Sequence, residues 1–173
     1  IAYGINKPYF YPIYILSKYL GEIAIRISIY VGLALSVGLV FVGSLEGFQV
    51  GNLPAIALVM ILGVMINAVL KMSIGMISFW IEDSTPFQWI YDKMLLVIGT
   101  IFPVEVFPMW AQPIIRSTPI YVIMYGPVKL VIDYSWDMFI KVLTTQVIYL
   151  GIGSLILLLT YKKGVKKVNV NGG

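Results

Sequence analysis

Three long stretches of this chain carry no charged residue, and they limit what the chain can fold into. Residues 47–70 form the longest, with 24 residues, while residues 27–45 and 142–161 contribute 19 and 20. An α-helix rises about 1.5 Å per residue, so about 20 apolar residues cross a hydrocarbon core of roughly 30 Å. Lipid offers the backbone no hydrogen-bonding partner, so such segments are helical within it. The sequence therefore predicts an all-α integral membrane protein.

The composition supports the same class and excludes several kinds of chemistry. Hydrophobic residues make up 60% of the 173 residues and charged ones 12%, whereas a soluble domain carries about 25% charged residues. This length suits a single membrane domain over residues 1–173, without a separate soluble enzyme domain. The chain has no cysteine and no histidine, which removes thiol chemistry, the commonest metal ligand and the usual general base. We therefore expect no enzyme activity and no catalytic, cofactor-binding or metal-binding residue.

Helix caps and prolines divide the chain into four predicted membrane spans. Asn52 is a plausible cap for the second span, and residues 85–88 (Thr-Pro-Phe-Gln) have the pattern of a capping box with proline at the first helical position. Pro103 ends the third span, because proline cannot continue a helix. The predicted spans are residues 23–45, 53–80, 86–102 and 136–161.

Two regions outside these spans are unusual. Residues 1–22 are aromatic and mildly basic, which favours a short helix lying in the membrane interface or an ordinary loop. Residues 103–133 contain five prolines that separate apolar pieces too short to span, and Thr118 before Pro119 again resembles a helix cap. Irregular backbone at membrane depth is tolerated only against protein or a water-filled cavity. We expect residues 103–133 to form two short helices that lie in the interface or re-enter the bilayer.

The distribution of basic residues predicts the orientation. Four spans place both ends of the chain on one side, with eight basic residues there against three on the other side when Lys71 is left out. Basic residues mark the cytoplasmic side of a membrane. Both termini and residues 1–22 are therefore predicted to be cytoplasmic, and residues 103–133 extracellular. The lysines of residues 162–167 are interpreted as a cytoplasmic anchor, and no nucleic-acid binding is expected.

Lys71 interrupts the second span. A lysine at the centre of a membrane helix costs roughly 2.5–3.5 kcal/mol on insertion scales. Its ammonium group either extends along the helix toward the inner surface or pairs with a neighbouring helix, and we favour the first arrangement.

Several motifs occur in an order that is typical of one family. They are Phe-Trp-Ile-Glu-Asp at residues 79–83, Pro-Val-Glu-Val-Phe-Pro-Met-Trp at residues 103–110, Thr-Pro at 118–119, Tyr-Gly-Pro at 125–127, Tyr-Lys-Lys-Gly at 161–164 and a terminal Gly172-Gly173. In this order the chain resembles the C-terminal two-thirds of an ABC type-2 transporter permease, the membrane subunit of an ABC exporter. Members of that family have six membrane helices, so the chain resembles helices three to six, with the N-terminal part missing.

The resemblance implies partners and roles. The segment around Lys7, Pro8 and Tyr9 corresponds to the cytoplasmic region that docks on the ATPase subunit, and residues 103–130 to a re-entrant extracellular hairpin capping the translocation path. A second permease subunit, identical or related, and two cytoplasmic ABC ATPase subunits are the implied partners, in a prokaryotic plasma membrane. ATP and Mg²⁺ would be bound by the ATPase, and the chain itself has no Gly-rich loop ending in Gly-Lys-Ser/Thr.

The candidate functional residues form two groups. Those proposed to couple to the ATPase are Lys7, Pro8, Tyr9, Glu82 and Asp83, and those proposed for the translocation path or its lid are Pro103, Glu105, Pro108 and Trp110. The two acidic residues of the first group alternatively mark the end of the second span or pair with Lys93, and Glu105 is alternatively a solvated surface residue. The competing function is an ATP-independent secondary transporter or channel fragment, which would place ionisable residues within its helices. The transported substrate is not predicted.

Overall fold

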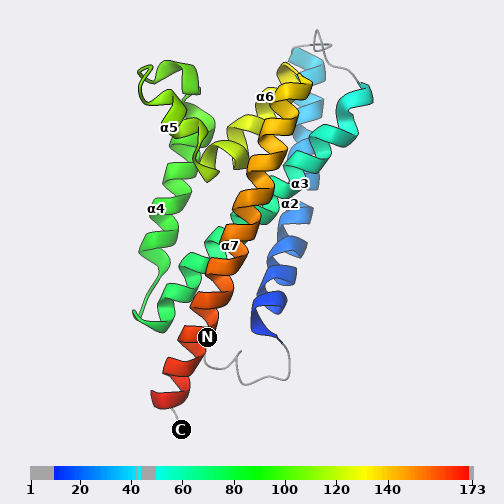
Figure 1. Cartoon of the computed structure of the whole chain (residues 1–173). Helices are drawn as coiled ribbons and strands as arrows, with labels where there is room; N and C mark the ends of the chain where they lie inside the picture. The colour runs from blue at the N-terminus through cyan, green and yellow to red at the C-terminus, as the bar shows by residue number, and fades with distance from the viewer. Residues whose placement is uncertain (1–9, 42, 44–49, 172–173) are drawn as a thin grey trace. The chain divides into compact units, whose positions relative to one another are not determined.

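The computed structural model describes residues 10–41, 43 and 50–171, and in these ranges it contains helices, turns and short connections but no strand (Figure 1). Three helical stretches are long and apolar enough to cross a membrane: Tyr11–Gly38, Val50–Phe79 and Trp136–Lys167. The predicted all-α class with several membrane-compatible helices is therefore confirmed. The chain forms two compact units, Ile1–Phe48 and Gln49–Gly173, which are described separately.

The described part of the first unit forms the helix α2 (Tyr11–Phe41), which runs without interruption for 31 residues. The predicted boundary at residue 23 is therefore wrong, because the helix continues through it, while the interfacial location of residues 1–22 stays a prediction. Pro12 lies in the first turn, where its missing amide hydrogen is not needed. Glu22 is four residues from both Lys18 and Arg26, a spacing that favours continuation of the helix. Charged residues alone therefore do not divide this helix.

The second unit begins with a helical stretch made of η1 (Val50–Asn52), α3 (Leu53–Gly75) and η2 (Met76–Phe79). Pro54 lies in the first turn of α3, and Asn52 precedes the helix as predicted, although its side chain does not form the capping hydrogen bond. Lys71 does not interrupt α3. The last four residues tighten into a 3₁₀ helix before the turn at residues 80–84.

The next helix, α4 (Thr85–Leu96), continues as the π-helical segment η3 (Val97–Ile101) and ends before Pro103. It begins at Thr85, so the cap position belongs to Ser84 and the predicted start at residue 86 is wrong by one residue. The Asp83 carboxylate accepts a hydrogen bond from the amide of Thr85 over 2.8 Å. This helical stretch is shorter than the three long ones, so a fourth crossing stays a prediction.

Short helices occupy the proline-rich region as predicted, but as four elements and not two. They are η4 (Val104–Val106), α5 (Gln112–Arg116), the π-helical η5 (Tyr121–Tyr125) and α6 (Gly126–Ile132). The hydroxyl oxygen of Thr118 accepts a hydrogen bond from the amide of Tyr121 over 3.4 Å, and the helix begins at Pro119, which confirms the predicted cap. In Figure 1, α5 and α6 lie toward the end of the unit where the last helix begins.

The last helix, α7 (Trp136–Asn171), begins where predicted, with the Ser135 hydroxyl accepting the amide hydrogen of Met138 over 3.3 Å. It does not stop at residue 161, because lysine favours helix and no proline follows. In Figure 1, α7 runs from the end that holds α6 to the opposite end, near the turn that joins α3 to α4.

The core of the second unit lies where α7 and the proline-rich segment pack on α3. One buried cluster joins α3, α6 and α7, and a second joins α3, α4 and the helix around η5. They consist of Ile56, Val59, Leu130, Phe139 and Val142, and of Ile66, Leu95, Ile120 and Ile123. Gly63 permits the second contact, since a Cβ atom there would lie 2.8 Å from the carbonyl oxygen of Ile123. Helices in membranes use small residues for such close approach.

Candidate functional site

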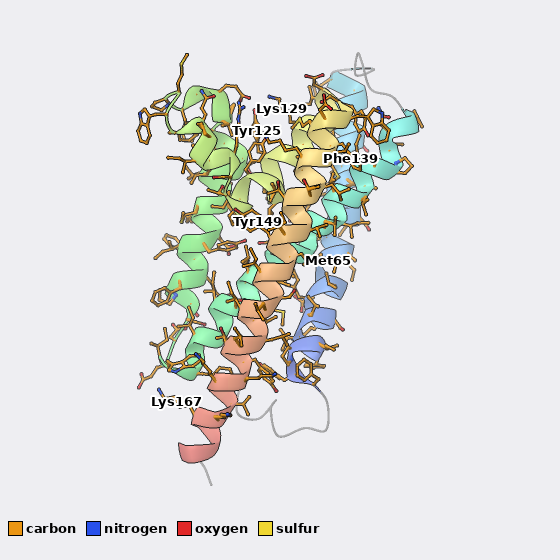
Figure 2. The ribbon with its side chains drawn as sticks, viewed as in Figure 1. Met65, Tyr125, Lys129, Phe139, Tyr149 and Lys167 are labelled. Atoms are coloured by element: carbon orange, nitrogen blue, oxygen red, sulfur yellow. The ribbon has the colours of Figure 1, made fainter. Side chains whose placement is uncertain are left out.

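A charged cluster joins the separate pieces of the proline-rich segment. The Glu105 carboxylate, on η4, accepts hydrogen bonds from the Lys129 ammonium over 2.8 Å and from the Tyr125 hydroxyl over 2.5 Å. The Arg116 guanidinium lies 3.9 Å from the same carboxylate. In Figure 2, Tyr125 and Lys129 lie toward the end where α7 begins, and Lys167 lies at the opposite end. One carboxylate therefore connects η4, α5, η5 and α6.

These contacts set the protonation states in the cluster. The hydrogen bonds from Lys129 and Tyr125 stabilise the charged carboxylate and lower the pKa of Glu105 from 4.5 to about 2. Burial and the hydrogen bond to Glu105 raise the pKa of Tyr125 to about 12. Glu105 is therefore ionised and Tyr125 neutral across the physiological range, and the cluster keeps a fixed arrangement of charge.

Two adjoining cavities open beside this cluster. The first has a volume of about 330 Å³ and is lined by Arg116, Lys129, Lys141, Tyr121, Asp137 and Thr145, among others. The second has a volume of about 870 Å³ and lies between α5 and α7. Arg116, Lys141 and Thr145 line both cavities, so the two are neighbours with a shared basic wall. The hydroxyl of Tyr149 also donates a hydrogen bond to the Ser117 carbonyl, which ties α7 to the end of α5.

A buried amide lies deeper in the same unit. The side chain of Gln146, on α7, is completely buried, and its Nε2 donates hydrogen bonds to the carbonyl of Val59 over 2.8 Å and to that of Val122 over 2.7 Å. Its Oε1 has no hydrogen-bonding partner among the described residues. One glutamine therefore joins α7 to both α3 and η5.

The backbone explains why Val122 needs this donor. In the π-helical pattern of η5, the amide of Gly126 donates to the carbonyl of Tyr121. The next carbonyl, that of Val122, would be paired with residue 127, which is proline and has no amide hydrogen. A buried carbonyl without a donor is costly, and the amide of Gln146 supplies one. Interruptions of this kind are common at functional positions in helices.

Lys71 forms an ion pair with a residue of the next helix. The favoured prediction, in which its side chain extends along the helix toward the membrane surface, is therefore wrong. Its ammonium lies 2.8 Å from one oxygen of the Asp92 carboxylate on α4 and 3.0 Å from the other. The Tyr91 hydroxyl, one residue earlier, donates a hydrogen bond to the Asn67 side chain over 2.9 Å. The alternative of pairing with a neighbouring helix is therefore the one observed, and two polar contacts hold α4 against α3.

The predicted site residues lie apart from one another. Lys7, Pro8 and Tyr9 fall outside the described residues, as do Gly172 and Gly173. Glu82 and Asp83, in the turn at residues 80–84, are both exposed. Hydrogen bonds from the hydroxyl and amide of Thr85 lower the pKa of Asp83. Neither carboxylate pairs with Lys93, whose ammonium lies 5.0 Å from the centre of the Trp89 ring.

Of the path and lid candidates, only Glu105 belongs to a polar cluster. Pro103, Pro108 and Trp110 are exposed, and Trp110 keeps 75% of its surface accessible. Glu105 is exposed, as the surface alternative expects, but its carboxylate also contacts Lys129, Tyr125 and Arg116, so it is not surrounded by solvent alone.

Gln146 and the basic wall formed by Arg116 and Lys141 are not among the residues predicted from the sequence. An amide within an otherwise apolar run was a signal for the first, since polar side chains in membrane helices usually find partners there. For the second, no local pattern brings residues of α5 and α7 together. Among the described residues, no group of three or more potential ligands has a metal-binding arrangement.

Comparison with known proteins adds no family assignment: no protein-family model, no curated protein and no solved structure matches the chain.

Proposed function

We propose that this chain is a membrane-spanning permease subunit of an ABC exporter, coupled to a separate ATPase. In this proposal the chain crosses the membrane four times, with α4 and η3 forming the third crossing. Residues 103–133 form a re-entrant hairpin on the outer side, and both chain ends are cytoplasmic. A second permease subunit completes the translocation path.

The path of the proline-rich segment is the observation that best supports this proposal. After η3 the chain forms short helices at one end of the second unit and then enters α7 from that same end (Figure 1). The Glu105 cluster holds these pieces together, and Gln146 fixes their deepest part to the long helices. A hairpin whose pieces are held together by hydrogen bonds and ion pairs is well suited to cap a translocation path. Such a hairpin can move as one rigid body when the two permease subunits rotate against each other.

The test is to purify the tagged chain from native membranes and measure ATP hydrolysis before and after removal of its partners. We expect an ATP-binding protein to co-purify, with vanadate-sensitive hydrolysis that disappears when the permease chain is isolated. ATP hydrolysis by the isolated chain would contradict the proposal.

A secondary transporter is the second candidate, and the Lys71–Asp92 ion pair is the observation that favours it. Paired ionisable residues within membrane helices are common in ion-coupled transport. Flux into ATP-free liposomes that follows an imposed ion gradient would support this alternative and contradict coupling to an ATPase.

A further inference from the structure

The two adjoining cavities differ in chemistry. Three cationic side chains, Arg116, Lys129 and Lys141, line the smaller one, against the single carboxylate of Asp137. Hydroxyl groups of Tyr121, Ser135 and Thr145 complete its polar lining. The larger cavity is also lined by Arg116 and Lys141, and much of the rest of its lining is apolar, including Met109, Pro113, Ile148 and Ile152.

Internal contacts do not neutralise the basic wall completely. Glu105 lies 2.8 Å from Lys129 but 3.9 Å from Arg116, so the first cation is paired closely and the second only loosely. Within the described ranges, no carboxylate lies within 4 Å of the Lys141 ammonium, although Asp137 precedes it by one helical turn. The site therefore offers an ammonium and a guanidinium to an anionic group.

The residues that the two cavities use on α7 form one stripe. Lys141, Thr145, Ile148 and Ile152 follow one another at intervals of four, three and four residues, which places them on the same face of the helix. Lys141 lies near the start of α7, and Ile152 lies about 16 Å further along the helix. The stripe thus changes from cationic near the helix start to apolar near the middle of a helix long enough to span a bilayer.

We infer that this stripe binds an anionic amphiphile, with a phosphate-bearing headgroup at Arg116 and Lys141 and an apolar chain along Ile148 and Ile152. Charge-assisted hydrogen bonds to phosphate hold the headgroup, and the apolar lining of the larger cavity covers the chain. The inference goes beyond the proposed function, because the site would bind such a molecule whether or not the chain works with an ATPase.

Native mass spectrometry of the full chain in detergent tests this site. The probes are phosphatidylglycerol, phosphatidylcholine with identical acyl chains, and inorganic phosphate. We expect phosphatidylglycerol to bind at least about tenfold more tightly than phosphatidylcholine, because both carry a phosphate but the quaternary ammonium of choline adds a positive charge that the basic wall repels. Lys141→Gln should remove most of that preference. Lys163→Gln, which changes an exposed lysine near the other end of α7, should leave it intact.

Ile152→Ala should weaken binding of both lipids by a similar factor, because it shortens the apolar lining without changing the charge. Glutamine and lysine have similar helix propensities, so Lys141→Gln should leave the thermal unfolding midpoint unchanged. Equal binding of the two lipids, or an equal loss with Lys141→Gln and Lys163→Gln, would overturn the inference. If inorganic phosphate displaced phosphatidylglycerol at equal concentrations, the site would recognise free phosphate and the amphiphile would be excluded.

Discussion

The Nε2 atom of Gln146 lies 2.7 Å from the carbonyl oxygen of Val122, a carbonyl whose π-helical partner position is occupied by proline. A third residue explains this contact. The backbone amide of residue 127 would otherwise be the donor, but residue 127 is a proline and has no amide hydrogen. Pro127, which removes one backbone donor, and Gln146, which supplies a donor from its side chain, are 19 residues apart in the sequence. We expect this contact to contribute to the packing of η5 against α7.

Replacing the glutamine tests that contribution. Gln146→Leu leaves the Val122 carbonyl buried without a donor and should reduce the free energy of unfolding by about 1–3 kcal/mol. The change is measured by SDS-induced unfolding in mixed micelles. Val147→Leu, at an exposed position one residue further on, is the control and should change stability little. Equal stability of the two variants would show that the hydrogen bond contributes nothing.

Gly63 is predicted to tolerate no larger side chain. A Cβ atom at this position would lie 2.8 Å from the backbone oxygen of Ile123, and a backbone group cannot move aside easily. Gly63→Ala should therefore destabilise the protein by about 1–3 kcal/mol through overpacking. Gly151 on α7 has no atom within 4 Å of its Cβ position, so Gly151→Ala should be neutral or stabilising by up to about 1 kcal/mol. The opposite order of the two unfolding midpoints would contradict this packing.

A double-mutant cycle tests the ion pair between α3 and α4. The side chains of Lys71 and Asp92 retain 28% and 48% of their surface, so their coupling should be about 1 kcal/mol, near the upper end for exposed pairs. Lys71→Met leaves a carboxylate unpaired and should destabilise the protein more than the double variant Lys71→Met/Asp92→Leu. Additive effects of the two substitutions would show that the pair is not formed.

Acid should weaken the Glu105 cluster over a defined pH range. The folded-state pKa of Glu105 is lowered from 4.5 to about 2, so its carboxylate stabilises the folded state fully above pH about 4.5. That contribution is lost as the pH falls from about 4.5 toward 2. Because the side chain is partly exposed, the effect should be no more than about 1 kcal/mol.

Thermal unfolding at several pH values measures this effect by comparison of variants. The stability advantage of the wild type over Glu105→Gln should shrink on acidification in that range. Glu82→Gln removes an exposed carboxylate with no ion pair to another described residue, and its difference from the wild type should vary much less. A constant difference between the wild type and Glu105→Gln would contradict the assigned contacts.

Local signals in the sequence were sufficient for the class of fold and for most helix starts. Pro54, Pro119 and Ser135 mark helix starts that the structure contains, because capping and proline effects act within one turn. Helix ends were predicted less well. The sequence predicts a boundary at residue 23 and a helix end at residue 161, yet both helices continue through these positions, where lysine, arginine and glutamate are good helix formers.

The site was less accessible to sequence analysis because its contacts are between elements. Glu105 was a candidate on its own, but its partners are 20 and 24 residues away, on helices whose packing no local pattern specifies. Lys71 and Asp92 are likewise 21 residues apart. The sequence allows Lys71 a partner on a neighbouring helix, and only the packing of α4 on α3 identifies that partner as Asp92.

The outer location of residues 103–133 is the central claim, and impermeant thiol labelling tests it most directly. The chain has no cysteine, so a single one introduced at Met109, whose side chain is 89% exposed, or at the exposed Lys166 is the only thiol present. In intact cells we predict labelling of Met109→Cys and no labelling of Lys166→Cys until the membrane is permeabilised. Labelling of Lys166→Cys in intact cells, or of Met109→Cys only after permeabilisation, would contradict the account.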